Sequence, residues 1–181
     1  MRIAIAIALT LAACSKEPTT VRVSAPTQEA PDDPLRPGTV APAFEATAHD
    51  GSTVSLASLR GRPVVLYFYP KDDTAGCTVE AQGFRDTFAD FAAAGATIVG
   101  VSTDGLASHR EFAAKHRLPF LLVADTDGRL AKSYGVGSTL GFTHRITFVI
   151  APDGKVAATF DDVDPDAHAP EVLAAVRATA H

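Results

Sequence analysis

From about residue 38 onward, the chain alternates between short apolar runs and segments with a single apolar face. The run PVVLYFY, from Pro63 to Tyr69, is continuous and rich in β-branched and aromatic residues, which is typical of a strand buried on both faces. A second run of this kind, ATIVGVS, occupies residues 96–102. Between them, Phe84, Phe88 and Phe91 recur at spacings of four and three, which predicts a helix with one apolar face.

The flanking segments extend this alternation. FEATAHDGSTVSL, at residues 44–56, places Asp50 and Gly51 between two extended pieces, which predicts a β-hairpin. The pattern then predicts a helix, a strand, a short helix, a strand–turn–strand unit and a closing amphipathic helix, at residues 107–116, 119–123, 128–135, 145–160 and 169–180. This order predicts an α/β domain with a central mixed β-sheet flanked by helices and an N-terminal β-hairpin. The ββα ending is typical of a thioredoxin-like fold.

The N-terminus has the features of an export signal. An apolar stretch, IAIAIALTLAA, follows Arg2 and is too short to span a bilayer, which needs about 20 residues. LAAC, which ends at Cys14, resembles the lipobox of bacterial lipoproteins, whereas an ordinary cleavage site after Ala13 would need a small residue in place of Leu11. We predict a lipoprotein signal peptide over residues 1–13 and lipid attachment at Cys14. The alternatives are a buried apolar strand or a misassigned start codon.

The segment from residue 14 to 37 differs in composition from the rest of the chain. Its prolines stand among Thr, Ser, Glu and Asp with no helical or alternating apolar period. We therefore expect a semi-extended tether that could reach roughly 70 Å, followed by a folded domain at residues 38–181. Lipid on Cys14 would hold this domain at a bacterial cell envelope, on the periplasmic side. In a Gram-negative cell, Ser15 after the lipidated cysteine would favour the outer membrane.

Composition and charge bound the chemistry of the chain. Hydrophobic residues make up 46% of it, enough for a substantial core, and the formal net charge is −5 without a Lys/Arg cluster, which argues against a nucleic-acid partner. The two cysteines form no CxxC motif, and no histidine stands at ligand spacing from them. Neither a disulfide framework nor a metal site is predicted, and no cofactor is expected.

Cys77 stands where the first apolar run meets a helix, in YPKDDTAGCTVEAQ. Pro70 ends the run, and if Thr74 is the N-cap, Cys77 is the third residue of the helix. There, unpaired backbone N–H groups and the positive end of the helix dipole stabilise a thiolate, the nucleophilic form of cysteine. This position favours an approachable, reactive thiol over a buried structural one. Asp72 and Asp73 are expected to be solvated loop residues.

The sequence around Cys77 resembles a known active-site signature. YFYPKDDTAGCTVEAQGFRD is similar to the peroxiredoxin pattern Pro-x-x-x-Thr-x-x-Cys, here Pro70, Thr74 and Cys77, and it looks closest to the bacterioferritin comigratory protein (PrxQ) subfamily. The similarity continues through VGVSTD, HRITFVI, DGKV and FDDV, and so covers essentially Gly38 to the C-terminus. The resemblance implies a thiol-dependent peroxidase that reduces hydrogen peroxide or organic hydroperoxides without a cofactor.

Carried over residue by residue, the resemblance implies five roles. Cys77 is the peroxidatic cysteine, which attacks a peroxide oxygen and becomes a sulfenic acid. Thr74 holds the thiolate and the peroxide with its hydroxyl, Pro70 shields the site from water, and Glu80 orients the polar network. Arg145 stabilises the thiolate and the charge on the leaving oxygen. Without the resemblance, the simpler interpretation of Thr74 is a helix cap, and that of Pro70 is a strand terminator. Glu80 would then be a partner of the helix dipole, and Arg145 a surface charge.

The predicted strands also indicate how Arg145 reaches Cys77. If RITFVI pairs antiparallel with PVVLYFY, the start of one strand lies beside the end of the other. Because Cys77 follows the end of the first strand and Arg145 begins the second, we expect the two side chains to lie close together although they are far apart in the sequence.

The chain departs from the subfamily pattern at one position. Many members carry a resolving cysteine five positions after the peroxidatic one, where this chain has Gln82. Since Cys14 is the only other cysteine, the comparison implies a one-cysteine peroxiredoxin. Its sulfenic acid would be reduced by an external thiol of a thioredoxin- or glutaredoxin-like protein or a small molecule. A monomer is expected, with membrane contact through the lipid alone. A thiol–disulfide exchange protein and a non-catalytic envelope lipoprotein stay open as alternatives.

Overall fold

The computed structural model describes residues 22–23 and 30–179. The predicted signal peptide and the predicted lipidation site Cys14 lie outside the described residues. Within those two ranges, no helix combines the length and the apolar character that crossing a membrane requires.

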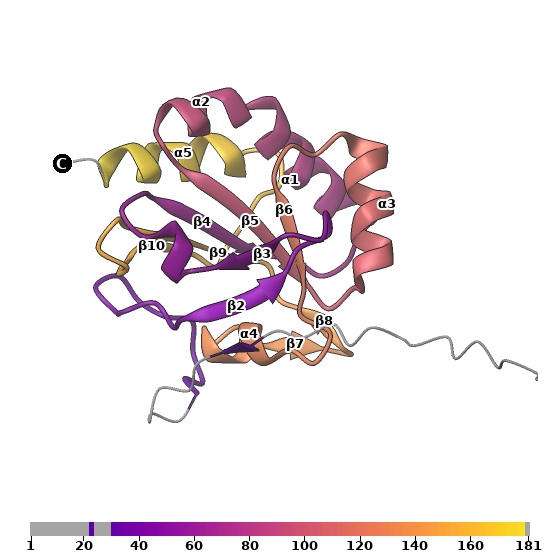
Figure 1. Ribbon diagram of the computed structural model, residues 1–181, viewed down its shortest axis with the longest axis horizontal. Coiled ribbons are helices and arrows are strands. Elements are labelled where there is room, and N and C mark those ends of the chain that lie inside the picture. Colours follow the sequence, from indigo (N-terminus) through magenta and orange to yellow (C-terminus); the bar gives the residue numbers. More distant parts are fainter. Residues whose placement is uncertain (1–21, 24–29, 180–181) are drawn as a thin grey trace, which may run out of the picture.

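A five-stranded mixed sheet forms the centre of the molecule (Figure 1). Its strands are β4 (Val64–Phe68), β5 (Thr97–Ser102), β6 (Leu121–Ala124), β9 (Ile146–Ile150) and β10 (Val156–Phe160). They lie in the order β10-β9-β4-β5-β6, with β4, β5 and β6 parallel, β9 antiparallel to β4, and β10 antiparallel to β9. The two long apolar runs of the sequence are therefore neighbouring parallel strands inside the sheet.

Short strands form two further sheets. In the first, β2 (Phe44–Thr47) pairs antiparallel with β3 (Thr53–Ser55), and β1 (Arg22–Val23) pairs with β2. The turn between β2 and β3 contains Gly51 at φ 88°, a left-handed conformation that favours glycine. The second is a hairpin of β7 (Ser138–Thr139) and β8 (Phe142–Thr143) just before β9. The β2–β3 pair confirms the hairpin that was predicted at residues 44–56.

Both faces of the central sheet are covered (Figure 1). One face packs against α1 (Ala75–Asp86), α2 (Phe88–Ala93), α3 (Leu106–His116) and α5 (His168–Ala178). The other packs against the β2–β3 hairpin and α4 (Arg129–Ser133), and a single 3₁₀ turn, η1 (Ala57–Leu59), follows β3. The predicted arrangement, a mixed sheet flanked by helices, is confirmed.

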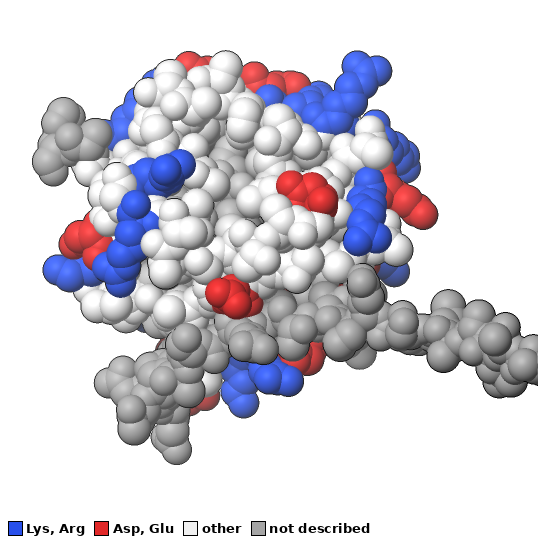
Figure 2. All heavy atoms as spheres, viewed as in Figure 1, with Lys and Arg blue, Asp and Glu red and all other residues white. Residues whose placement is uncertain are grey.

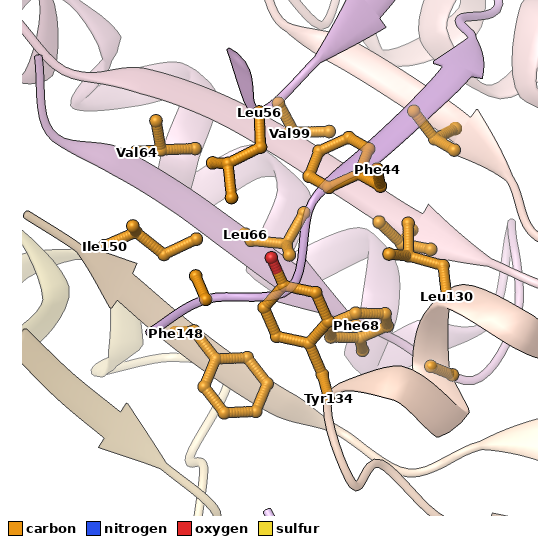
Figure 3. Close-up of a cluster of buried hydrophobic side chains, with 14 of the residues drawn as sticks. Phe44, Leu56, Val64, Leu66, Phe68, Val99, Leu130, Tyr134, Phe148 and Ile150 are labelled. Carbon is orange, nitrogen blue, oxygen red and sulfur yellow. The ribbon is translucent and has the colours of Figure 1, made fainter. Parts of the chain in front are cut away.

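Strand β4 carries core side chains on both of its faces. Leu66 and Phe68 pack with Phe148 in one hydrophobic cluster (Figure 3), whereas Val65 and Tyr67 enter the cluster beneath the helices. Every residue of β4 is buried, as its unbroken apolar sequence predicted. Full burial of a large apolar side chain contributes about 1.5–3 kcal/mol, so this strand anchors both layers of the core.

The helix predicted from three phenylalanines is two helices. α1 ends at Asp86 and α2 begins at Phe88, with Thr87 between them at φ −100° and ψ 7°. The Thr87 hydroxyl donates to the Gly83 carbonyl at 2.7 Å, a bond to the preceding turn that bends helices. Phe84 and Phe91 remain fully buried on either side of the bend, so the apolar face survives although the helix is interrupted.

Part of the segment predicted as a tether contacts the domain. The backbone N–H of Leu35 donates to the Tyr134 carbonyl at 3.2 Å, and the Thr159 hydroxyl donates to the Leu35 carbonyl at 2.6 Å. Leu35 also packs against the cluster shown in Figure 3. The residues just before position 38 are therefore bonded to the domain, while the boundaries of the three predicted parts of the chain stay predictions.

Charged side chains are spread over the surface, and a small buried set stands apart from them. On the face shown in Figure 2, Lys and Arg lie interspersed with Asp and Glu, with uncharged surface between them. The buried acidic residues are Asp72, Glu80 and Asp125, and the buried histidines are His109 and His168. Asp125 accepts backbone N–H bonds at the start of α4. The other four lie around the first half of α1, where the sequence predicts the active site.

A glycine in β5 gives a direct test of this packing. A Cβ at Gly100 would lie 2.7 Å from the Tyr67 ring and from Leu122, so Gly100→Ala should destabilise the domain by about 1–3 kcal/mol. Gly83→Ala, inside α1, is the control, because its Cβ would meet Ala169 at an ordinary 3.5 Å and should stabilise the helix by about 0.5–1 kcal/mol. Urea denaturation midpoints measure both effects, and equal midpoints for the two variants would contradict the described packing.

Candidate active site

Cys77 occupies the first turn of α1, as predicted. Thr74 is the N-cap, with an extended backbone at φ −78° and ψ 151°, and Cys77 follows as the third helical residue. The sulfur therefore lies near the unpaired N–H groups and the positive end of the helix dipole. The side chain is only 1% exposed, however, and packs with Ala81 and Tyr69. The expected approachable thiol is wrong in this respect, because the helix turns Cys77 towards the sheet.

Arg145 reaches this buried sulfur from the far end of the chain. It immediately precedes β9, and the antiparallel register pairs Ile146 with Phe68, the last residue of β4. One guanidinium nitrogen, Nη2, donates to Cys77 Sγ at 3.2 Å across 68 residues of sequence. The predicted antiparallel pairing and the predicted proximity of the two side chains are both present in the structure.

The other guanidinium nitrogen binds the third predicted residue of the site. Arg145 Nη1 donates to the Glu80 carboxylate, whose side chain is fully buried one turn after Cys77. The two terminal nitrogens of one guanidinium thus contact the Cys77 sulfur and the Glu80 carboxylate. A Cβ at Gly76 would lie 3.3 Å from Arg145 Nη2, so the glycine before Cys77 leaves room for this close approach.

Burial and the neighbouring charges shift the pKa values of Glu80 and Arg145. Burial raises the pKa of Glu80 to about 7, against the opposing effect of the Arg145 guanidinium. Burial alone lowers the pKa of Arg145, but Glu80 and Cys77 outweigh it, so the pKa of Arg145 lies above its usual value. Arg145 therefore stays positive, whereas Glu80 can gain or lose a proton near neutral pH.

His168 lies next to Glu80, and the sequence predicted no role for it. Its Nε2 is 2.8 Å from Thr147 Oγ1 and 3.9 Å from Glu80 Oε1, and its ring packs edge-on against Phe84 and Phe160. Burial, followed by the charge of Arg145, lowers the pKa of His168 to about 4. The imidazole is therefore neutral at physiological pH. Its place near the start of α5 was its only signal in the sequence.

Thr74 and Pro70 lie at the edge of the site. The Thr74 hydroxyl donates to the Lys71 carbonyl at 3.1 Å, and no hydrogen bond joins it to Cys77. Pro70 lines a cavity of about 660 Å³ together with Arg145 and Phe142. The structure thus brings Cys77, Glu80 and Arg145 together and leaves Thr74 and Pro70 beside them, so the roles predicted for these two residues stay predictions.

The loop before Cys77 is anchored by Asp72, contrary to the expectation of a solvated residue. Its carboxylate lies within 2.7 Å of the Tyr69 and Ser108 hydroxyls and 2.9 Å from His109 Nδ1. Asp72 is 6% exposed, whereas Asp73 is exposed as expected. The correction has a tertiary cause, because Ser108 and His109 come from α3 and no local pattern marks them as partners.

Comparison with known proteins agrees with this geometry. The AhpC/TSA family matches residues 37–159 of the chain. A Coxiella burnetii protein named as a peroxiredoxin, bcp, is 40% identical over 143 residues, which cover 75% of this chain and 95% of that protein. The chloroplastic peroxiredoxin Q of Triticum aestivum is 44% identical over 139 residues, covering 75% of this chain and 64% of that protein. Peroxidoxin BcpB of Mycobacterium tuberculosis has a TM-score of 0.75 at 38% identity, covering 80% of this chain and 97% of that one.

The chain therefore belongs to the AhpC/TSA family. Within it, the chain is a peroxiredoxin of the BCP/PrxQ subfamily with a thioredoxin-like fold, and peroxiredoxins are thiol-dependent peroxidases that act on peroxides. In the part of the chain that the structure describes, no three His, Cys, Asp or Glu side chains gather as a metal site would require.

Asp72 gives a pH-dependent test of the loop anchor. Burial alone raises the pKa of Asp72, but hydrogen bonds from His109, Ser108 and Tyr69 outweigh it and lower the pKa below 3.8. The ionised carboxylate therefore stabilises the fold above about pH 4, and this contribution is lost as the pH falls through the lowered pKa. Asp72→Asn should destabilise the domain by about 1–3 kcal/mol at pH 7 and by less under acidic conditions.

The neighbouring Asp73→Asn is the matched control. Its side chain is 44% exposed and pairs with Lys115 and His116 at the surface, so its loss should cost about 1 kcal/mol or less. Thermal or urea unfolding from pH 7 to pH 3 measures both variants. A penalty for Asp72→Asn that does not change with pH would show that its charge is not what anchors the loop.

Proposed function

We propose that Cys77 reduces hydrogen peroxide or organic hydroperoxides and is itself oxidised to a sulfenic acid. The observation that supports this most directly is the 3.2 Å contact from Arg145 Nη2 to Cys77 Sγ in the first turn of α1. A guanidinium and a helix N-terminus both favour the thiolate, and the thiolate is the nucleophile. Structures of the Xanthomonas campestris bacterioferritin comigratory protein, 36% identical to this chain, concern the alkyl peroxide reduction activity of that protein.

The reaction has two bond changes. The thiolate attacks the terminal peroxide oxygen, a sulfur–oxygen bond forms, and the oxygen–oxygen bond breaks. Sulfur keeps the OH group as sulfenic acid, and the other oxygen leaves as hydroxide or alkoxide, which takes a proton to become water or an alcohol. Arg145 is the group that would meet the negative charge on this leaving oxygen, since it stays charged and presents several N–H donors.

The sulfenic acid would then be reduced by an external thiol. Cys77 is the only cysteine of the predicted domain, and Gln82, which stands five positions later, cannot form a disulfide. An incoming thiol would attack Cys77 to form a mixed disulfide and release water, and a second thiol would free Cys77. A thioredoxin- or glutaredoxin-like protein or a small thiol would serve, and the enzyme would act as a monomer.

The site of action is proposed from the N-terminal sequence. A lipid on Cys14 would tie the domain to the periplasmic side of a bacterial membrane and would remove this second sulfur from redox chemistry. The enzyme would then remove peroxides in the cell envelope. Mass spectrometry of the membrane-bound protein would test this proposal, since an acylated N-terminal Cys14 is the expected product.

The oxidised state of Cys77 gives the first test of the proposed reaction. Peroxide should convert Cys77 of the reduced protein to a dimedone-reactive sulfenic acid, without any disulfide within the chain, because no partner cysteine is present in the domain. Mass spectrometry after one equivalent of peroxide measures both species. Cys77→Ser should abolish peroxide consumption with dithiothreitol as reductant. Unchanged consumption would favour a non-catalytic thiol and exclude this mechanism.

Arg145 gives the second test. Arg145→Ala should slow the oxidation of Cys77 about 100- to 1,000-fold, because a donor aimed at developing charge is lost. Arg177→Ala is the control, since Arg177 is exposed and pairs with Asp90 at the surface. Stopped-flow peroxide competition measures the rate constants. An Arg145→Ala rate equal to that of Arg177→Ala would remove Arg145 from the mechanism.

A further inference from the structure

Two acids share one cation in the active site. Arg145 Nη2 contacts Cys77 Sγ at 3.2 Å, and Nη1 of the same guanidinium contacts Glu80. Cys77 is 1% exposed and Glu80 is 1% exposed, so water does not screen either group effectively. One buried positive charge therefore faces two groups that can each carry a negative charge.

The groups around Glu80 supply no second positive charge. From α5, His168 is neutral because its pKa is lowered to about 4, and from β4 the buried Tyr67 hydroxyl has a pKa raised by burial and then by Glu80. Among the described residues, Arg145 is the one cation that bonds to Glu80. If Cys77 and Glu80 were both ionised, the site would hold a net negative charge in a buried environment, which is unfavourable.

The two Glu80 oxygens have unequal surroundings, which also favours a protonated Glu80. Oε2 accepts from Arg145, whereas Oε1 is buried and has no hydrogen-bond partner. A buried carboxylate that lacks a donor on one oxygen is costly because it carries charge, whereas a neutral carboxylic acid with the same missing contact costs less. The buried, unpartnered Oε1 fits a Glu80 that is protonated.

We propose that Glu80 takes up a proton when Cys77 ionises and gives it up when Cys77 is oxidised. In the resting enzyme, Cys77–SH and Glu80–COO⁻ exchange to Cys77–S⁻ and Glu80–COOH. Attack on the peroxide gives Cys77–SOH and RO⁻, and the net proton from Glu80 converts RO⁻ to ROH and restores Glu80–COO⁻. The site keeps one negative charge beside Arg145 before and after the reaction. This inference rests on the proposed function, because it needs Cys77 to react with peroxide.

The pKa of about 7 for Glu80 supports this exchange, since a carboxyl with that pKa binds and releases its proton near neutral pH. Glu80 does not touch the substrate in this scheme. It acts as a proton-holding residue through Arg145 and Cys77, which is a more specific role than orienting the polar network.

Infrared difference spectroscopy of the full domain tests the proposal just below neutral pH. Oxidation with one equivalent of peroxide should remove a protonated-carboxyl band from the reduced protein and add a carboxylate band. The band should be absent in Glu80→Gln, whose amide keeps an acceptor for Arg145 but carries no titrating proton. Glu111→Gln, an exposed change on α3, is the matched control and should keep the band. Labelling the glutamates with ¹³C in the unaltered protein assigns the band to a glutamate even if Glu80→Gln does not fold, and among the described residues Glu80 is the buried glutamate.

The outcomes separate this inference from the proposed function. If Cys77 is oxidised by peroxide but no glutamate band changes, the proton exchange is wrong and the peroxidase function stands. A band that changes equally in Glu80→Gln would also contradict it, because it would belong to another residue. If peroxide does not oxidise Cys77 at all, the proposed function fails and the proton exchange fails with it.

Discussion

The guanidinium of Arg145 joins the parts of the chain on which the site depends. It begins the segment that leads into β9, and its two nitrogens contact Cys77 and Glu80 on α1. Because the contacts are buried, the interaction is strong and also restrictive, since one cation balances one negative charge at a time. The proposed nucleophile and the proposed proton-holding carboxyl are therefore linked through a single side chain. In this account, their chemistry cannot be separated from that link.

The fold supplies the geometry that this contact needs. The antiparallel register of β4 and β9 sets the start of β9 beside the end of β4, so Arg145 arrives where the loop to α1 begins. Asp72 holds that loop to α3 through Ser108 and His109, and Gly76 leaves space for the guanidinium. A sheet buried on both faces makes this arrangement rigid, since neither β4 nor α1 can shift without disturbing the core.

Several features could be predicted because local sequence encodes them. Apolar runs gave the central strands, and the position of Thr74 gave the first turn that carries Cys77. The contact between Cys77 and Arg145 followed from the expected pairing of two strands. The anchoring by Asp72 and the placement of His168 could not be predicted, because their partners come from distant elements. Burial of Cys77 was missed for the same reason, since it depends on how α1 packs against the sheet.

A double-mutant cycle on the oxidation of Cys77 tests the shared cation most directly. The rate constants would be measured for the unaltered protein, Glu80→Gln, Arg145→Ala and the double variant, with the same peroxide and at the same pH. If both acids act through one guanidinium, the factor produced by Glu80→Gln should be much smaller once Arg145 is absent, with a coupling energy of about 0.5–3 kcal/mol. The same factor in both backgrounds would contradict the account.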